Sequence, residues 1–370
     1  MEPKQIKVAK PFIGKEEIEA VSQVLLSGQY ASGSRVSEFE SKFAEYIGTD
    51  YAVAVNSGTS ALYIALEAMG IQEGDEVIVP PMSFFATISS VLYLKAIPVF
   101  ADIDMDDLCL SPDSVCESIT EKTKAILPVH LFGAAAKMDQ IKKIANDNNI
   151  AVLEDCAQSH GTEFEGQKTG SFGTAGAFSF FATKHMTTGE GGIITTNSSE
   201  IAETVRIIRN HGMTGRDDHV RLGFNNRMTE MEAAMGLVQL SKLDDLNLRR
   251  IQNSEYLLSK LSQIPWIKLF KPHSTIKHTY FWCPITISED CNKSIDDLKA
   301  YLNKHGIGFR HRYSEPLYRQ PVLEKFGLDF SKTFLPNVEK LAGEIIGLPN
   351  HSDLTKHELD HVINVVKNFC

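Results

Sequence analysis

The sequence predicts an α/β fold built on a mainly parallel sheet, and three features of the chain support this prediction. Short apolar runs recur between stretches that have the 3.6-residue apolar spacing of helices. The run 51–55 leads through a glycine-containing turn at 56–59 into a helical pattern. A second run, 150–153, ends at Glu154 and Asp155, and open α/β sheets present ligand-binding residues at such strand ends. Strands that alternate with helices in this way form right-handed βαβ units.

The first half of the chain follows this alternation. Two amphipathic helices are expected near the N-terminus, because apolar residues recur on one face and each pattern stops at a glycine, Gly28 or Gly48. The run 76–79 is expected to be a strand that ends at two prolines. The expected strands are 51–55, 76–79, 98–101, 125–129, 150–155 and 192–196, and the expected helices are 18–28, 36–48, 61–69, 137–148 and 200–210, with another beginning near 82.

The second half begins with a capping box. Thr229 and Glu232 have the spacing at which each side chain satisfies the other residue's backbone donor, which predicts the start of a long helix. The remaining third mixes helices at 255–263, 295–305 and 355–369 with a strand at 279–286. At 370 residues, 43% hydrophobic and 23% charged, the chain is expected to be a globular enzyme of two domains. We expect a large domain at 1–249, which includes the N-terminal helical segment, and a smaller α+β domain at 250–370.

Charge and cysteine content exclude several classes of protein. A formal net charge of −10 argues against a general nucleic-acid binder, because phosphate contact needs a basic face. No segment reaches the length of a membrane span, and the first five residues lack an apolar signal core. The cysteines show no CxxC spacing, which indicates reduced thiols in a cytoplasmic protein. They are Cys109, Cys116, Cys156, Cys283, Cys291 and Cys370.

The segment 178–194, FSFFATKHMTTGEGGII, contains the first chemical signal. Three of the four residues 189–192 are glycine, which suggests a backbone that a ligand approaches closely. Lys184 lies between an apolar run and this turn. Lysine is seldom buried unless it is paired or used chemically, and a partly desolvated lysine has a lowered pKa that suits Schiff-base chemistry. Taken alone, Lys184 fits a surface lysine better, so its assignment depends on its neighbours.

A second set of polar residues supplies those neighbours. Asp155 ends its strand, Gln158 and His160 follow at once, and Ser179 lies in the aromatic run before Lys184. A carboxylate, a serine and a lysine placed in this way could hold a pyridine ring, a phosphate and an aldehyde. The residues therefore predict a site for pyridoxal phosphate, and they predict no metal site.

Three stretches of the chain resemble one protein family closely. They are 56–62 (NSGTSAL), 154–161 (EDCAQSHG) and 183–192 (TKHMTTGEGG). In this order they are similar to the DegT/DnrJ/EryC1/StrS family of sugar aminotransferases, and the likeness extends from residue 10 to residue 349. The resemblance implies an aspartate-aminotransferase-like fold of pyridoxal phosphate fold type I, with a mainly parallel mixed sheet in the large domain.

The resemblance also implies roles around the cofactor. Lys184 is expected to bind pyridoxal phosphate covalently and then to move a proton, while the cofactor passes through its pyridoxamine phosphate form. Asp155 is expected to keep the pyridine nitrogen protonated, so that the ring withdraws electrons. The other implied cofactor contacts are Gly58, Thr59, Ser60 and Ser179 at the phosphate, Gln158 at the phenolic oxygen and Phe84 on the face of the ring.

Partner and substrate contacts are implied in further segments. The polar stretch 212–226 is too long for a simple turn, and the resemblance gives it an asparagine that reaches the phosphate site of the other subunit in a homodimer. Asn225 is favoured, and Asn226 stays open. The segment 306–323 is expected to fold over the site, and many members have histidine where this chain has Tyr318, which affects the choice of sugar. The implied substrate contacts are His160, His185, Arg310, His311, Tyr313 and Tyr318.

Together these residues indicate an aminotransferase. It would move an amino group from an amino acid, with L-glutamate as the expected donor, to a nucleotide-linked 4-keto-6-deoxy or 3-keto sugar, for a surface polysaccharide or a glycosylated product. One alternative is a sugar dehydratase of the same fold, but there a histidine replaces the lysine. The other is a regulator that keeps fold and cofactor without catalysis, which the complete set of Lys184, Asp155 and Gln158 disfavours.

One motif points to a different enzyme class. The stretch from His357 to His361, HELDH, matches the HExxH pattern of zinc peptidases. On a helix both histidines would lie opposite the apolar face and are expected to face water. Glu358 also completes a capping box with Thr355. The motif is therefore interpreted as the start of a surface helix.

Overall fold

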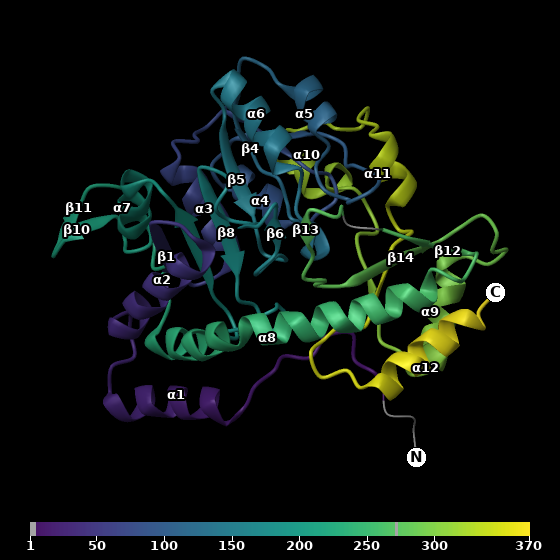
Figure 1. Cartoon of the computed structure of the whole chain (residues 1–370). Helices are drawn as coiled ribbons and strands as arrows, with labels where there is room; N and C mark the ends of the chain where they lie inside the picture. The colour runs from purple at the N-terminus through teal and green to yellow at the C-terminus, as the bar shows by residue number, and fades with distance from the viewer. Residues whose placement is uncertain (1–4, 271–272) are drawn as a thin grey trace.

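A seven-stranded sheet organises the large domain (Figure 1). The computed structural model of the chain describes residues 5–270 and 273–370. The strand order is β1-β9-β8-β5-β4-β2-β3. Strand β9 is antiparallel to both of its neighbours, and the other neighbouring pairs are parallel. The predicted mainly parallel sheet is therefore confirmed. Its strands are β1 (Tyr51–Val55), β2 (Glu76–Val79), β3 (Ile97–Phe100), β4 (Thr123–Ile126), β5 (Ala151–Asp155), β8 (Ala175–Ser179) and β9 (Gly192–Thr196).

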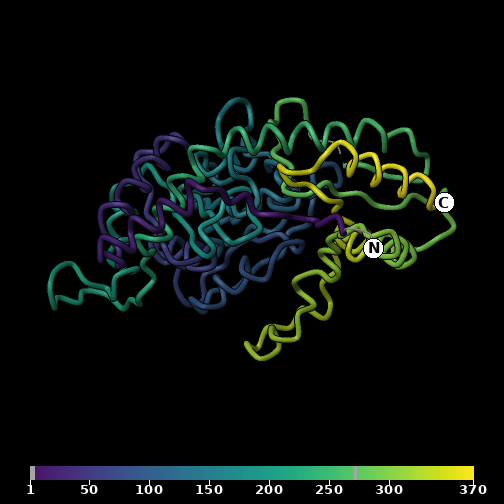
Figure 2. Tube along the Cα trace, turned by 90° about the horizontal axis from the view of Figure 1, so that it is seen from below, coloured from purple at the N-terminus to yellow at the C-terminus, as the bar shows by residue number. Residues whose placement is uncertain are grey.

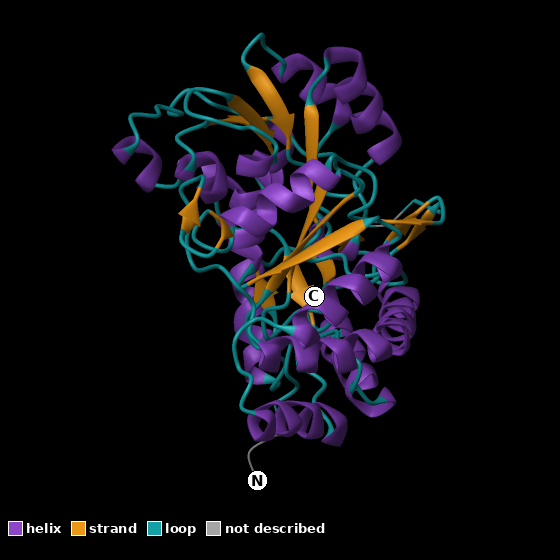
Figure 3. Cartoon of the chain, turned by 90° about the vertical axis from the view of Figure 1, so that its left-hand side faces the viewer, coloured by secondary structure: helices purple, strands orange, loops and turns teal. Residues whose placement is uncertain are grey.

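Helices cover both faces of this sheet (Figure 3). They include α2 (Ser34–Ile47), α3 (Gly58–Ala68), α4 (Ala86–Tyr93), α5 (Pro112–Ser118), α6 (Met138–Asn148) and α7 (Ser199–Ile208). Alternate side chains of β1 pack in two different hydrophobic clusters. Ala52 and Ala54 pack with side chains of α2, whereas Val53 and Val55 pack with side chains of α3. Because successive side chains of a strand point to opposite faces, α2 and α3 lie on opposite sides of the sheet.

The longest helix, α8 (Glu230–Leu261), begins at the predicted capping box. It runs along the lower side of the molecule in Figure 1 and packs against α1 (Lys15–Ser27) and α2. Its first half gives Leu243 to a core of the large domain, and its end gives Leu257 to the core of the small domain. The separate helix expected at 255–263 is wrong, because that segment is the end of α8. The expected domain boundary at 249 falls inside the helix and stays a prediction.

The small domain is built on an antiparallel sheet of order β12-β14-β16-β15. Leu298 and Val362 from its two main helices lie in the core of this domain. Between β15 and β16 the chain returns to the large domain, where Leu317 and Leu323 are buried. The elements are β12 (Ile267–Leu269), β14 (Cys283–Ile287), α9 (Ile295–Lys304), β15 (Arg310–His311), α10 (Val322–Lys325), α11 (Pro336–Leu341), β16 (Ile346–Leu348) and α12 (Lys356–Lys367).

Two small sheets complete the fold. Strands β10 (Met213–Gly215) and β11 (Asp218–His219) form a hairpin that projects from one end of the molecule (Figures 1 and 2). The predicted polar stretch 212–226 contains this hairpin. The other sheet pairs β13 with β6 and β6 with β7, and so ties the chain after α8 to the large domain. Its strands are β6 (Glu163–Phe164), β7 (Gln167–Lys168) and β13 (Ile276–Lys277).

The expectation that all six cysteines are free thiols is wrong. Cys291 and Cys370 form a disulfide, with their Cα atoms 5.9 Å apart. The two residues are separated by 79 positions and belong to no spacing motif, so the sequence offered no signal for the pairing. Cys109, Cys116 and Cys156 are free, as is Cys283.

The HExxH motif begins α12, as expected. Its capping box of Thr355 and Glu358 is confirmed, and His357 is exposed. The expectation that both histidines face water needs correction, because His361 is half-buried and its Nε2 atom lies 3.1 Å from the carbonyl oxygen of His305. Across residues 5–270 and 273–370, no helix has the length and apolar character needed to cross a membrane.

Candidate active site

A cavity of about 480 Å³ lies where the carboxyl ends of three parallel strands meet. Ser57 follows β1, Asp155 ends β5 and Ser179 ends β8, and all three residues line the cavity. This is the edge at which open α/β sheets bind ligands, and the volume is within the range of roughly 300–1,000 Å³ of small-molecule sites. Of the predicted site residues, those that line it are Gly58, Thr59, Phe84, Asp155, Gln158, Ser179, Lys184, Arg310 and Tyr313.

Lys184 lies in the turn after β8. Its backbone N–H donates to the carbonyl oxygen of Phe181 at 2.9 Å, so the turn folds back on the chain that follows the strand. Burial lowers the pKa of the Lys184 amine to about 8; the charge of Asp155 opposes this change and that of Arg312 adds to it. The Nζ atom lies 4.9 Å from the centroid of the Phe281 ring. With this pKa, a fraction of the Lys184 amine is unprotonated near neutral pH. Only the unprotonated amine can act as a nucleophile or as a general base.

Asp155 is buried, and its carboxylate has two hydrogen-bond donors. Oδ2 accepts the hydroxyl of Thr87 at 3.0 Å, and Oδ1 accepts the backbone N–H of Ala157 at 3.1 Å. The Thr87 hydroxyl is also 2.7 Å from that of Ser83, and Ser83 is the donor there because Thr87 gives its proton to Asp155. Burial raises the pKa of Asp155, although both hydrogen bonds and the charge of Lys184 act in the opposite direction. A cationic group placed against this carboxylate would favour its ionised form.

The start of α3 forms another wall of the cavity. Ser57 caps the helix, because its hydroxyl accepts the backbone N–H of Ser60 at 3.1 Å. The N–H groups of Gly58 and Thr59 belong to the first turn, where a helix offers them no internal partner. A Cβ atom at Gly58 would lie 2.5 Å from Cβ of Ser179, so only glycine lets α3 begin this close to the end of β8. Free amides, the helix dipole and the Ser179 hydroxyl together suit an anion such as phosphate.

Gln158 connects the two domains at the cavity. Its Oε1 atom accepts the backbone N–H of Phe132 at 3.1 Å, and this settles the orientation of the amide, because a backbone N–H can only donate. The amide nitrogen therefore donates to the hydroxyl of Tyr313 at 3.2 Å. Burial raises the pKa of Tyr313, so the phenol stays protonated and keeps its own proton for another acceptor.

Two arginines from the small domain line the same cavity, Arg310 and Arg312. Burial lowers the pKa of Arg310, and the positive charge of Arg312 adds to this effect, so the two guanidinium groups are close enough to interact. The Cζ atom of Arg312 lies 6.0 Å from the centroid of the Phe84 ring. Phe84 is 54% exposed, and Phe181 on the same cavity is 44% exposed. The cavity therefore combines cationic groups with exposed aromatic rings.

Apart from Asn225, five predicted contacts do not line the cavity, and their assignments stay predictions. Ser60 is buried, and its N–H is used by the cap at Ser57. His160 and His185 are buried with their rings 5.5 Å apart. Burial lowers the pKa of His160 to about 3 and that of His185 well below its ordinary value, so both are neutral. They contribute to the protein interior beside Lys184 and do not reach the space for a substrate.

The remaining two are His311 and Tyr318. The Nε2 atom of His311 lies 2.7 Å from the carbonyl oxygen of Gly343, and the hydroxyl of Tyr318 donates to the carboxylate of Glu339. Both polar groups therefore have partners inside the chain. Tyr318 therefore does not line the cavity.

The two asparagines that follow the hairpin differ in exposure. Asn226 is buried, its side-chain amide donates to the hydroxyl of Tyr63, and its carbonyl oxygen accepts the N–H of Asn56 at 2.9 Å. Asn225 is exposed. Asn226 therefore has a structural role within its own chain, and Asn225 is the one of the two that another molecule could reach.

Sequence reasoning gave no role at the site to Ser57, Thr87, Phe281 or Arg312, which line the cavity or contact a residue that does. Ser57 and Arg312 lie inside segments that were already singled out, so a signal was present: a hydroxyl at a helix cap, and a second arginine near Arg310. Thr87 and Phe281 carry no such signal. Their segments have ordinary core patterns, and only the folded chain brings them to Asp155 and Lys184.

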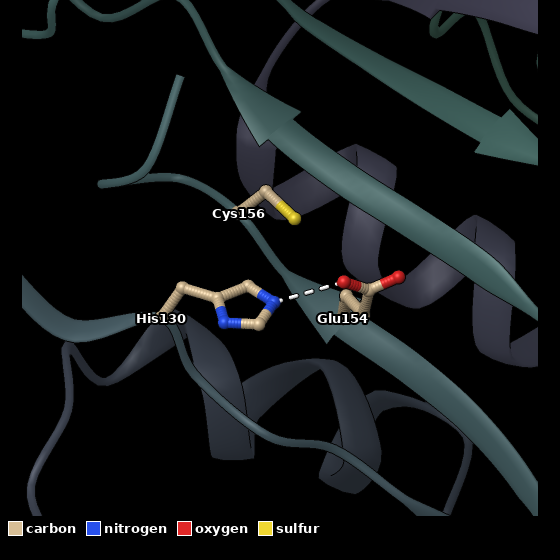
Figure 4. Close-up of side chains that lie close together, drawn as sticks. All are labelled: His130, Glu154 and Cys156. Atoms are coloured by element: carbon tan, nitrogen blue, oxygen red, sulfur yellow. Dashed lines mark hydrogen bonds and ion pairs between the residues drawn. The ribbon is translucent and has the colours of Figure 1, made fainter. Parts of the chain in front are cut away.

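A buried cluster at the end of β5 contains residue types that bind metal ions. His130, Glu154 and Cys156 offer ligand atoms within 4.8 Å of one another (Figure 4). The carboxylate of Glu154 is 2.9 Å from Nε2 of His130, and it also accepts three backbone N–H groups, including that of Gly170 at 2.8 Å. Nδ1 of His130 accepts the N–H of Ala136 at 3.1 Å. Because the ligand atoms of His130 and Glu154 already have partners, we interpret the cluster as an anchor for the end of β5.

Comparison with known proteins places the chain among relatives that match nearly its whole length. It is 34% identical over 375 residues to the spore coat polysaccharide biosynthesis protein SpsC of Bacillus subtilis, and the match covers 97% of this chain and 95% of that protein. It is similar in structure to Helicobacter pylori PseC, an aminotransferase involved in the biosynthesis of pseudoaminic acid, with 29% identity, a TM-score of 0.92 and coverage of 99% of both chains.

A further similar structure is the PLP form of Spr1654 from Streptococcus pneumoniae, with 28% identity, a TM-score of 0.91 and coverage of 99% of this chain and 98% of that one. The model of the DegT/DnrJ/EryC1/StrS aminotransferase family matches residues 11–367. With the strand order and the cavity described above, this match shows that the chain belongs to the DegT/DnrJ/EryC1/StrS aminotransferase family.

Proposed function

We propose that this protein is a pyridoxal phosphate-dependent sugar aminotransferase that moves an amino group from L-glutamate to a nucleotide-linked keto-sugar. Its family is one of aminotransferases. Spr1654 has been solved in PLP and PMP forms, which supports the cofactor and its amino form. The roles of SpsC in polysaccharide biosynthesis and of PseC in the biosynthesis of pseudoaminic acid support a sugar as the acceptor.

The observation that carries the proposal is the meeting of three different groups in one cavity. These are the amine of Lys184, the carboxylate of Asp155, and the start of α3 beside Ser179. Pyridoxal phosphate has the complementary set: an aldehyde, a ring nitrogen that can be protonated, and a phosphate dianion. The glycine that lets α3 approach Ser179 and the low pKa of Lys184 both fit this ligand.

When bound, pyridoxal phosphate supplies an aldehyde that accepts an amino group and a ring that withdraws electrons from the reacting carbon. Lys184 supplies the amine that attaches the cofactor, and its Nζ atom then takes a proton from Cα of the donor and returns it as a general acid. Asp155 holds a proton on the ring nitrogen. Thr87 and Ala157 keep that carboxylate in one orientation through their hydrogen bonds.

The arginines support an anionic substrate on the small-domain side of the cavity. Glutamate carries carboxylates and a nucleotide sugar carries a diphosphate, and guanidinium groups bind both through paired hydrogen bonds. The two substrates would use Arg310 and Arg312 in turn, since the donor leaves before the acceptor binds. Tyr313, whose oxygen accepts from Gln158, is left to donate its proton to an oxygen of the substrate.

We also propose a homodimer with shared active sites, in which Asn225 completes the phosphate site of the other subunit. The exposure of Asn225 supports this arrangement. So do three apolar residues of the same segment, Val220, Leu222 and Phe224, which are 53%, 78% and 47% exposed. Neighbouring exposed apolar side chains of this kind are typical of a contact surface. We propose that the protein is located in the cytoplasm, where thiols stay reduced. The four free cysteines support this location, whereas the Cys291–Cys370 disulfide does not.

Half-reactions test this function. L-glutamate alone should convert the cofactor of the holoenzyme to its pyridoxamine form, with loss of the visible-edge absorbance and release of one 2-oxoglutarate per site. Addition of UDP-, dTDP- or GDP-linked 4-keto-6-deoxy and 3-keto sugars should restore the absorbance for the true acceptor. A cofactor that responds to no amino acid would support a regulator, and a deoxygenated sugar product would support a dehydratase.

A further inference from the structure

The ring of Phe281 lies against the amine of Lys184. The Nζ atom is 4.9 Å from the ring centroid, within the distance of about 6 Å at which a ring face attracts an ammonium group. Phe281 is 4% exposed, and both residues line the same cavity. Lys184 is half-buried, so the contact is partly removed from water, and this strengthens the attraction between a cation and a ring.

The backbone around Phe281 fixes the position of its ring. Its N–H donates to the carbonyl oxygen of Phe132 at 2.8 Å. Gly133 has a φ of +96°, and a Cβ atom there would lie 2.6 Å from the nitrogen of Tyr280, so the two segments are as close as glycine permits. On the cavity wall, Trp282 stacks on Phe281 with a centroid distance of 4.9 Å. The ring cannot turn away from the cavity without disturbing these contacts.

Four other side chains near the amine are charged or titratable, and none of them attracts it once the cofactor is bound. Arg312 repels an ammonium group, and Asp155 attracts it. His160 and His185 are neutral, because burial keeps their pKa values low. In the proposed function Asp155 faces the ring nitrogen of the cofactor, so its charge is used there when the cofactor is bound. Among the described residues that act on the amine, Phe281 is then the attractive neighbour that remains.

We propose that Phe281 is a positioning residue for Lys184, whose ring holds the ε-ammonium group against the cavity wall whenever the amine is not bonded to the cofactor. The inference rests on the proposed function, in which Lys184 is free during part of each cycle. The four-carbon stem of a lysine is flexible. A ring that holds its end keeps the amine within reach of the reacting carbon and favours its protonated form.

Ring fluorination tests this proposal with little change in the shape of the side chain, because fluorine withdraws electrons from the ring face that attracts the cation. Phe281 is replaced by phenylalanine with one, two or three ring fluorines in the full-length protein loaded with pyridoxamine phosphate. Labelling of Lys184 by trace acetic anhydride is followed against pH by peptide mass spectrometry. The apparent pKa of the amine should fall with each fluorine. Phe281→Leu should show the largest effect, a loss of about 2- to 30-fold in proton affinity.

The same fluorinated residues at Phe132 are the matched control. Phe132 is also buried, and its ring lies 5.2 Å from that of Trp282, so fluorine there tests packing alone and should leave the Lys184 labelling curve unchanged. An unchanged pKa in all fluorinated Phe281 variants that retain normal cofactor content would overturn the proposal. Failure of the proposed function would look different: borohydride would then attach pyridoxal phosphate to a lysine other than Lys184.

Discussion

The hydroxyl of Thr87 donates a hydrogen bond of 3.0 Å to Oδ2 of Asp155. Thr87 belongs to α4 and Asp155 ends β5, so two separate elements set the orientation of the carboxylate. Ser83 supports Thr87 from 2.7 Å. A helix for which the sequence predicts no catalytic role therefore positions the acid on which the proposed chemistry depends.

Thr87→Val keeps the shape of the side chain and removes this donor. A hydrogen bond to a charged group contributes about 1.5–3 kcal/mol, so the affinity for pyridoxal phosphate should fall about 10- to 100-fold. Titration of the cofactor-free protein by absorbance measures this. Thr87→Ser, which keeps the hydroxyl, is the control. Wild-type affinity in the valine variant would show that the N–H of Ala157 is sufficient.

Asp155→Asn should lower kcat by orders of magnitude while the cofactor remains bound through Lys184, Ser179 and the start of α3. An amide cannot stabilise a protonated ring nitrogen as a carboxylate does. Single-turnover rates with L-glutamate and the cofactor content of the purified variant separate the two effects. Near-normal rates would place the partner of the ring nitrogen elsewhere.

Lys184→Met should stabilise the cofactor-free protein at pH 7. Burial lowers the pKa of Lys184 from 10.5 to about 8, so between these values the folded chain binds fewer protons than the unfolded chain. The penalty of the buried charge is complete below pH 8 and fades as the pH rises toward 10.5. The gain in urea midpoint should therefore be larger at pH 7 than at pH 10. Exposed Lys124 changed to Met is the control, and an equal gain at both pH values would contradict the lowered pKa.

Subunit mixing tests the shared active site. Inactive Lys184→Ala and inactive Asn225→Ala should regain activity when their subunits exchange, because one hybrid site then receives both defects and the other receives neither. Asn226 should be left intact, since it supports its own chain through Tyr63 and Asn56. Heterodimers without recovered activity would show that each site is complete within one chain.

Much of the fold could be predicted because its signals are local. The capping box at Thr229 and the glycine stops at Gly28 and Gly48 depend on nearest neighbours in sequence, and the structure confirms all three. The unbroken course of α8 beyond 249 could not be predicted, because it depends on packing against two domains at once. The return of 317–345 to the core of the large domain is likewise a tertiary effect.

Some residues of the candidate site could likewise be predicted from local signals, and others could not. Lys184, Asp155 and Ser179 lie in motifs where residue type and strand ends coincide, and the structure brings them to one cavity. His160 and His185 lie in the same motifs, yet the chain buries them, since alternate residues of a turn can face the interior. Sequence reasoning identified segments that reach the cavity but could not decide which side chains within them face it.

Reduction of the holoenzyme with borohydride tests the central claim most directly, because it makes the bond between pyridoxal phosphate and its lysine permanent. Peptide mass spectrometry should then find the cofactor on Lys184 alone, and Lys184→Ala should fold, form the same oligomer and lack multiple turnovers. A cofactor attached to another lysine, or an alanine variant that turns over at an appreciable fraction of the wild-type rate, would contradict the assignment of Lys184 as the residue that carries the reaction.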